Sequence, residues 1–101
     1  MEVNWSDKAR FRVREIFDFY NIKSSRAASK LIEDIADAGN SLSKFPQMAA
    51  IEPVLSDLPI AYRALVVREN YKIIYFVNEN VNIVTVWDCR QDDKKLKKEI
   101  G

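Results

Sequence analysis

Three short runs rich in β-branched and aromatic residues dominate the second half of the chain. They span Tyr62–Arg68, Tyr71–Val77 and Val81–Trp87. Short breaks that contain asparagine separate them, first Glu69-Asn70 and then Asn78-Glu79-Asn80. Runs of this length with breaks this short predict a three-stranded antiparallel meander.

Each predicted strand has two faces, because side chains along a strand point alternately to opposite sides. Two-residue turns at Glu69-Asn70 and Glu79-Asn80 would set three cross-strand pairs: Val67 with Lys72, Ile74 with Thr85, and Lys72 with Trp87. One face is then almost wholly apolar and needs a cover: Ala64, Val66, Tyr71, Ile73, Tyr75, Val77, Val84 and Val86. The other is mixed: Arg63, Leu65, Val67, Lys72, Ile74, Phe76, Ile83, Thr85 and Trp87. A slip of one residue in either turn would exchange the faces of one strand. Under this register we expect the mixed face to be open and to carry the function.

The first residues predict an edge strand and then an amphipathic helix. Met1–Trp5 alternates, and Ser6 is placed to cap the helix that follows. The apolar stripe of that helix consists of Ala9, Val13, Ile16, Phe17 and Tyr20. Phe11 and Phe19 lie off the stripe. Either the helix is buried on more than one side, or these two residues mark a surface for a partner.

A second helix follows after a short break and is capped by Ser24 or Ser25. Its buried stripe consists of Ala28, Leu31, Ile32, Ile35 and Leu42. Glycine disfavours helix, so we expect fraying or an end near Gly39, and Phe45-Pro46 is a clear stop. Two helices with so short a linker form an antiparallel hairpin, which is the expected cover for the apolar face of the meander.

The remaining segments are a loop and a tail. Residues 47–60 contain two prolines and no sustained period, which indicates a loop between the helices and the sheet. The polar stretch Asp88–Gly101 allows a short terminal helix with little to bury, because only Leu96 and Ile100 share a side. The sequence therefore predicts one α+β domain over residues 1–101, with the N-terminal strand and helical hairpin packed on a mainly antiparallel sheet.

Composition narrows the chemistry. The chain has no histidine, one cysteine (Cys89) and two glycines, and its net charge is +1. These counts exclude histidine-dependent nucleophiles, histidine or multi-cysteine metal sites and glycine-rich phosphate loops. We therefore expect no metal and no cofactor. No run long enough for a membrane span and no export signal is visible, so we expect a cytoplasmic protein.

The candidate site consists of cations around an aromatic ring. Arg63 and Lys72 would project from the mixed face, Trp87 would lie beside Lys72, and Arg90 follows the last strand. Such a set suits a polynucleotide, because cations pair with phosphates while an aromatic ring stacks on a base. The alternative is that Arg63 and Lys72 are solvated charges on a half-exposed sheet and that Trp87 anchors a core.

The tail adds four lysines: Lys94, Lys95, Lys97 and Lys98. Lys94 and Lys95 are candidates for contacts with nucleic-acid phosphates. The alternative is that the run is simply the solvated face of a helix, and Asp92 and Asp93 neutralise part of it.

In the order and the sequence of these segments, the chain resembles the RelE/ParE toxins of bacterial type II toxin–antitoxin systems. The resemblance rests on four stretches: Leu42 with Phe45-Pro46, Tyr62–Val67, Asn70–Tyr75 and Ile83–Asp92. It implies a small α+β toxin that arrests growth. It also implies a cognate antitoxin that wraps around the toxin in a hetero-oligomer and covers its functional surface.

The resemblance leaves the target open between three activities. RelE-like members cut messenger RNA on the ribosome without a metal. Three cations of this chain match that group by their positions in the sequence. The resemblance implies that Arg90 would stabilise the charge on the reacting phosphate, Lys72 would hold or protonate that phosphate, and Arg63 would position the RNA backbone. Leu65 and Leu96 stand where that group carries a lysine and a tyrosine, and only Asp88 or Asp92 offers a general base. ParE-like members instead poison DNA gyrase without catalysis, and the long hairpin with its L-x-x-F-P turn looks more like theirs. The third alternative is a module that has lost its activity and only binds its antitoxin.

Overall fold

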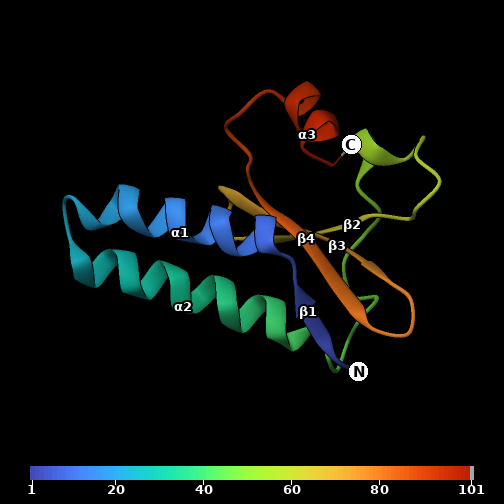
Figure 1. Ribbon diagram of the computed structural model, residues 1–101, viewed down its shortest axis with the longest axis horizontal. Helices are drawn as coiled ribbons and strands as arrows, with labels where there is room; N and C mark the ends of the chain where they lie inside the picture. Colours follow the sequence, from blue (N-terminus) through green and yellow to red (C-terminus); the bar gives the residue numbers. More distant parts are fainter. Residues whose placement is uncertain (101) are drawn as a thin grey trace.

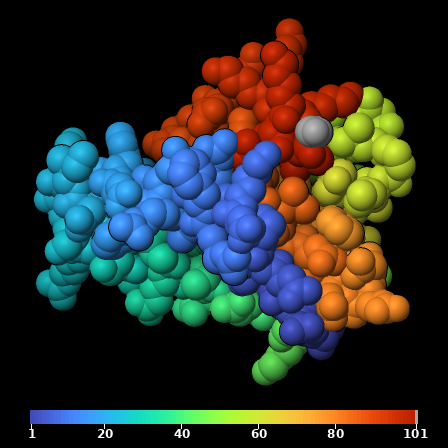
Figure 2. Space-filling model, in the orientation of Figure 1, coloured from blue at the N-terminus to red at the C-terminus, as the bar shows by residue number. Residues whose placement is uncertain are grey.

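The computed structural model describes residues 1–100 and confirms the predicted α+β class. In chain order the elements are β1 (Val3–Trp5), α1 (Asp7–Asn21), α2 (Ser25–Ser41), the 3₁₀ turn η1 (Pro53–Leu55), β2 (Arg63–Val67), β3 (Tyr71–Val77), β4 (Val81–Asp88) and α3 (Asp93–Ile100). Figure 1 shows the antiparallel hairpin of α1 and α2 on one side of the molecule, with α3 beside η1 on another. The space-filling view in Figure 2 shows α1 next to the tail that carries α3.

The four strands form one sheet in the order β1-β4-β3-β2. The strands β2, β3 and β4 form the predicted antiparallel meander. The N-terminal strand is an edge strand, as predicted, and it pairs in parallel with β4, Val3 lying opposite Val81. No helix among residues 1–100 is long and apolar enough to cross a lipid bilayer.

The turn between β2 and β3 is one residue longer than predicted. Val67 pairs with Tyr71, so Arg68, Glu69 and Asn70 all belong to the loop, and the expected pairing of Val67 with Lys72 is wrong. Arg68 and Glu69 adopt left-handed backbone conformations with φ of 51° and 64°, although neither is a glycine. Because side chains alternate along a strand, this single extra residue exchanges the two faces of β2.

The turn between β3 and β4 is also longer than predicted, but a β-bulge compensates for it. Val77 pairs with Val81 across a three-residue turn, and the register then shifts between Ile74 and Tyr75. On the side of the shift away from the turn, the predicted pairs of Ile74 with Thr85 and of Lys72 with Trp87 are confirmed. On the side of the shift toward the turn, Tyr75 pairs with Ile83, so the predicted faces of Ile83 and Val84 are wrong.

Both faces of the sheet are covered, so the prediction of an open mixed face is wrong. The hairpin packs on the face with Tyr71, Ile73 and Tyr75. The opposite face carries a second buried cluster: Leu55 from η1, Tyr62, Ile74, Trp87 and Leu96 from α3. Leu96 is fully buried, so α3 buries more than its sequence indicates.

Serine side chains begin both long helices, as predicted. The Ser6 hydroxyl accepts a hydrogen bond from the amide of Ala9 at 3.0 Å, and Ser24 does the same for Ala27 at 3.1 Å. Helix α2 ends at Ser41, near Gly39 as predicted, but it continues through the glycine itself. The ring of Trp5 packs directly on this glycine, where a Cβ would overlap it.

Candidate functional site

Arg63 lies on the same face of the sheet as the helical hairpin, because it pairs with Tyr75. Its guanidinium Nη1 donates a hydrogen bond to the backbone oxygen of Ala49 at 2.6 Å. The side chain therefore holds the loop that runs beside the edge strand β2. The extra turn residue is the reason that Arg63 points away from the face that the sequence assigned to it.

Lys72 lies on the opposite face of the sheet and is largely enclosed there. Its ammonium group is hydrogen-bonded to Glu52, and the side chains of Lys72 and Glu52 are 16% and 3% exposed. Glu52 also caps η1 by accepting a hydrogen bond from the amide of Val54 at 3.3 Å. Arg63 and Lys72 thus do not meet on a shared surface, and the predicted three-cation site is not assembled.

Trp87 is beside Lys72, as predicted, but it is only 5% exposed. It packs in the second core with Ile74 and Leu96. The indole Nε1 has no hydrogen-bond partner within residues 1–100. With α3 in place, the indole ring is not available to stack on a base.

Arg90 is exposed and belongs to a connected polar cluster. Asp88 receives hydrogen bonds from Nε and Nη2 of Arg90 at 2.9 and 3.0 Å. Nη2 also donates to the Tyr71 hydroxyl at 3.1 Å, and the guanidinium lies 5.7 Å from the centre of the Tyr71 ring. The Tyr71 hydroxyl in turn donates to the Tyr20 hydroxyl at 3.2 Å. The cluster thus joins the end of β4 to the end of α1.

The ionisation of Tyr71 and Asp88 suits recognition better than proton transfer, although the hydrogen bond with Tyr71 lowers the pKa of the third member, Tyr20. Burial raises the pKa of Tyr71, so its hydroxyl stays protonated. The hydrogen bonds from Arg90 lower the pKa of Asp88, so this carboxylate is ionised and already occupied. A general base needs a pKa near the working pH, and neither Tyr71 nor Asp88 has one.

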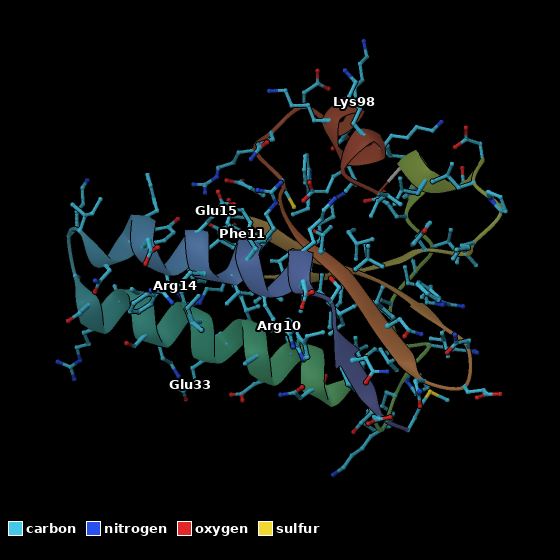
Figure 3. All side chains as sticks on the ribbon, viewed as in Figure 1. Arg10, Phe11, Arg14, Glu15, Glu33 and Lys98 are labelled. Atoms are coloured by element: carbon cyan, nitrogen blue, oxygen red, sulfur yellow. The ribbon has the colours of Figure 1, made fainter. Side chains whose placement is uncertain are left out.

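A groove of about 360 Å³ opens over the cluster. It runs between α1 and the segment that follows β4, and its lining mixes charged, aromatic and aliphatic side chains: Arg12, Glu15, Ile16, Phe19, Tyr71, Val86, Trp87, Asp88, Arg90 and Gln91. We call it the Arg90 groove. On the other side of α1 lies a more apolar groove of about 420 Å³ against α2, rimmed by Arg10 and Arg14. Figure 3 shows Phe11 and Glu15 on the side of α1 toward α3, away from Arg14.

Phe11 and Phe19 are 57% and 68% exposed. The helix is therefore not buried on a second side, and the two rings extend the Arg90 groove as an open aromatic surface. Sequence reasoning did not assign Arg12, Tyr20 or Tyr71 to the site. The signal that pointed to this side of α1 was the pair of phenylalanines outside the buried stripe.

The tail lysines lie on α3. Lys94 and Lys95 are exposed, and neither makes an ion pair with any residue from 1 to 100. Lys97 differs, because it pairs with Asp57 next to η1. Among the described residues, no group of three or more histidine, cysteine or carboxylate side chains is placed to hold a metal ion.

Comparisons with known proteins found one matching family model and a structure of similar fold. The model of the ParE toxin of the type II toxin–antitoxin system parDE matches residues 3–93. A solved chain of the chromosomal ParDE system from P. aeruginosa is similar in fold, with a TM-score of 0.73 and 22% identity, over 87% of this chain and 95% of that one. No curated protein sequence matches the chain.

Proposed function

This chain belongs to the family of ParE toxins of type II toxin–antitoxin systems, and on that premise we propose that it arrests growth by binding DNA gyrase, without cutting nucleic acid. Membership of the family implies an antitoxin partner. The observation that carries the proposal is the separation of Arg63 and Lys72 onto opposite faces of the sheet. A nuclease that works through those cations would need them within reach of one phosphate.

The state of each cation supports the same conclusion. Lys72 is held by the buried carboxylate of Glu52, and Arg63 is bonded to the loop backbone. Of the three predicted cations, Arg63, Lys72 and Arg90, it is Arg90 that faces an open groove, and Asp88 already neutralises it. A surface of paired charges beside exposed phenylalanines suits contact with a folded protein, because interfaces combine aromatic anchors with satisfied polar groups.

Ribosome-dependent cleavage of messenger RNA is the second candidate function. The observation that favours it is the contact of Arg90 with the Tyr71 phenol at the edge of an open groove. An arginine there could stabilise a phosphate on which charge develops. This candidate uses Arg90 alone of the three predicted cations.

One induction experiment decides between the two functions. The chain is expressed in a bacterium that lacks the neighbouring antitoxin gene, and both transcript ends and chromosomal breaks are mapped. We expect gyrase-dependent double-strand breaks with intact messages. Codon-phased cuts in translated messages, with no breaks, would overturn the proposal in favour of cleavage.

Substitution of Arg90 sharpens the comparison. Under cleavage, Arg90→Ala lowers the rate about a hundredfold or more, because one aligned donor to a transition state is worth that much. Under gyrase binding the loss is smaller and appears as weaker affinity for gyrase. Lys98→Ala is the matched control, because Lys98 lies on the outer side of α3 (Figure 3) and should leave toxicity unchanged.

A further inference from the structure

The carboxylate of Glu99, near the end of α3, collects the polar contacts that hold this helix to the rest of the fold. Arg12 of α1 donates to it twice, Nε to Oε2 at 2.6 Å and Nη2 to Oε1 at 2.7 Å. The hydroxyl of Thr85 on β4 donates to Oε2 at 2.8 Å. Lys8 donates to the backbone oxygen of Glu99 at 2.6 Å. Only 7% of the Glu99 side chain is exposed, so this carboxylate is enclosed by its partners and is not part of a surface ion pair.

Arg12 connects this contact to the Arg90 groove. It lines the groove, and its third nitrogen, Nη1, donates to Glu15 at 2.6 Å, another lining residue. Its guanidinium carbon lies 5.6 Å from the centre of the Phe11 ring. Because Nε and both terminal nitrogens of Arg12 are bonded to carboxylates, the plane of its guanidinium is fixed by α3 on one side and by α1 on the other.

We infer that Glu99 is a positioning residue for the Arg90 groove: it holds Arg12 in the groove wall, so the shape of the target-binding surface depends on the docking of α3. This inference rests on the proposed function, because it assigns the groove to the target. Glu99 itself lies outside the groove and acts on it through Arg12.

The build of α3 explains why such a contact is needed. A helix of eight residues is not stable by itself in water, so α3 keeps its place through tertiary contacts. Leu96 supplies the apolar contact and Glu99 the polar one. Glu99 forms ion pairs with Arg12 and, at 3.9 Å, with Lys8. The ion pair of Lys97 with Asp57 does not involve Glu99; it is exposed and lies on the η1 side, away from the groove.

The ion pair of Lys97 with Asp57 provides a matched control. Glu99→Gln and Asp57→Asn each remove one charge that holds α3, but only the first residue contacts Arg12. We expect Glu99→Gln to shift or broaden the nuclear magnetic resonance signal of the Arg12 Nε–H and to weaken binding to purified gyrase by about tenfold. Asp57→Asn should change neither. If the two variants leave the Arg12 signal and the gyrase affinity equally unchanged, the inference is wrong.

A double-mutant cycle separates positioning from a general loss of structure. Arg12→Gln, Glu99→Gln and the double variant are compared for gyrase binding. If Glu99 acts through Arg12, Glu99→Gln has no further effect once Arg12 is replaced. An equal effect in both backgrounds would mean that Glu99 merely supports the fold, and it would overturn the inference. Failure of the unaltered chain to bind gyrase would instead refute the proposed function, while the Arg12 signal would still test the contact.

Discussion

The buried ion pair between Lys72 and Glu52 makes the sharpest prediction, because it tests whether Lys72 supports the fold or acts on a substrate. Lys72→Met removes the ammonium and keeps an apolar stem of similar length. Glu52 is then left 3% exposed, with only the weak hydrogen bond from Val54 at 3.3 Å. Breaking a buried pair from one side costs about 3–5 kcal/mol, because the remaining charge is uncompensated.

We expect the lower end of that range, about 3 kcal/mol, because 16% of the Lys72 side chain still reaches solvent. For a domain of this size, each kcal/mol shifts Tm by about 4–8 °C, so Tm should fall by roughly 12–24 °C. Native domains have about 5–15 kcal/mol of stability, so the variant should still fold at room temperature. Urea unfolding followed by tryptophan fluorescence measures the loss.

Two further variants make the reasoning refutable. The double variant Lys72→Met with Glu52→Gln removes both charges and should regain most of the lost stability, and it should remain toxic. Lys97→Met is the matched control, since it breaks an exposed pair with Asp57 and should cost less than about 1 kcal/mol. A Lys72→Met protein as stable as the unaltered one, or a folded double variant without toxicity, would show that Lys72 acts in function.

Three other outcomes are expected. Gly39→Ala should destabilise the fold by about 1–2 kcal/mol in urea, because the added Cβ overlaps Trp5 and this cost exceeds the gain in helix propensity; a stabilised variant would contradict the packing. The pKa values of Glu99 and Asp88 are lowered, chiefly by hydrogen bonds from their arginine partners. Both carboxylates therefore stabilise the fold at pH values above their ordinary pKa values of 4.5 and 3.8, and this stabilisation is lost as the pH falls below those values. Urea midpoints from about pH 6 to about pH 2 should therefore fall less steeply for Glu99→Gln than for the unaltered chain, and equal slopes would count against the Glu99 contact. Phe19→Gln should change stability by less than about 0.5 kcal/mol, because the ring is 68% exposed, while it lowers toxicity; full toxicity would remove this ring from the target surface.

Element type could be predicted because local chemistry decides it here. Ser6 and Ser24 sit where an orphan amide needs an acceptor, and both act as caps. The β-branched runs form the meander because they suit a pleated surface that is buried. Local rules of this kind depend on a few neighbouring residues, so they can be applied before the tertiary structure is known.

The register could not be predicted, because it depends on one residue in each turn. The loop of Arg68, Glu69 and Asn70 contains two left-handed residues and no glycine to signal them. In the second hairpin, an equal error in turn length was cancelled by a bulge at Val84, which nothing in the sequence of β4 marks. The same kind of miscount therefore moved Arg63 to the other face but left the pairing of Lys72 with Trp87 intact.

Contacts across long separations account for the rest of the candidate site. Arg12 and Glu99 are 87 residues apart in the chain, and Tyr71 meets Tyr20 across 51 residues. Each of these side chains has an ordinary place in its own helix or strand, so periodicity gives no reason to pair them. Only the docking of α3 and of α1 on β4 brings them together.

The burial of Lys72, by contrast, had a signal in the sequence. A strand covered on both faces reads as a continuous apolar run, and β3 is such a run interrupted by one charge. Glu52 is likewise the single charge between Ile51 and Leu55. Charges buried in a fold are almost always paired, so an isolated cation in one apolar run and an isolated anion in another are candidates for each other. That rule assigns Lys72 to the fold and leaves Arg63 and Arg90 as the cations to test for function.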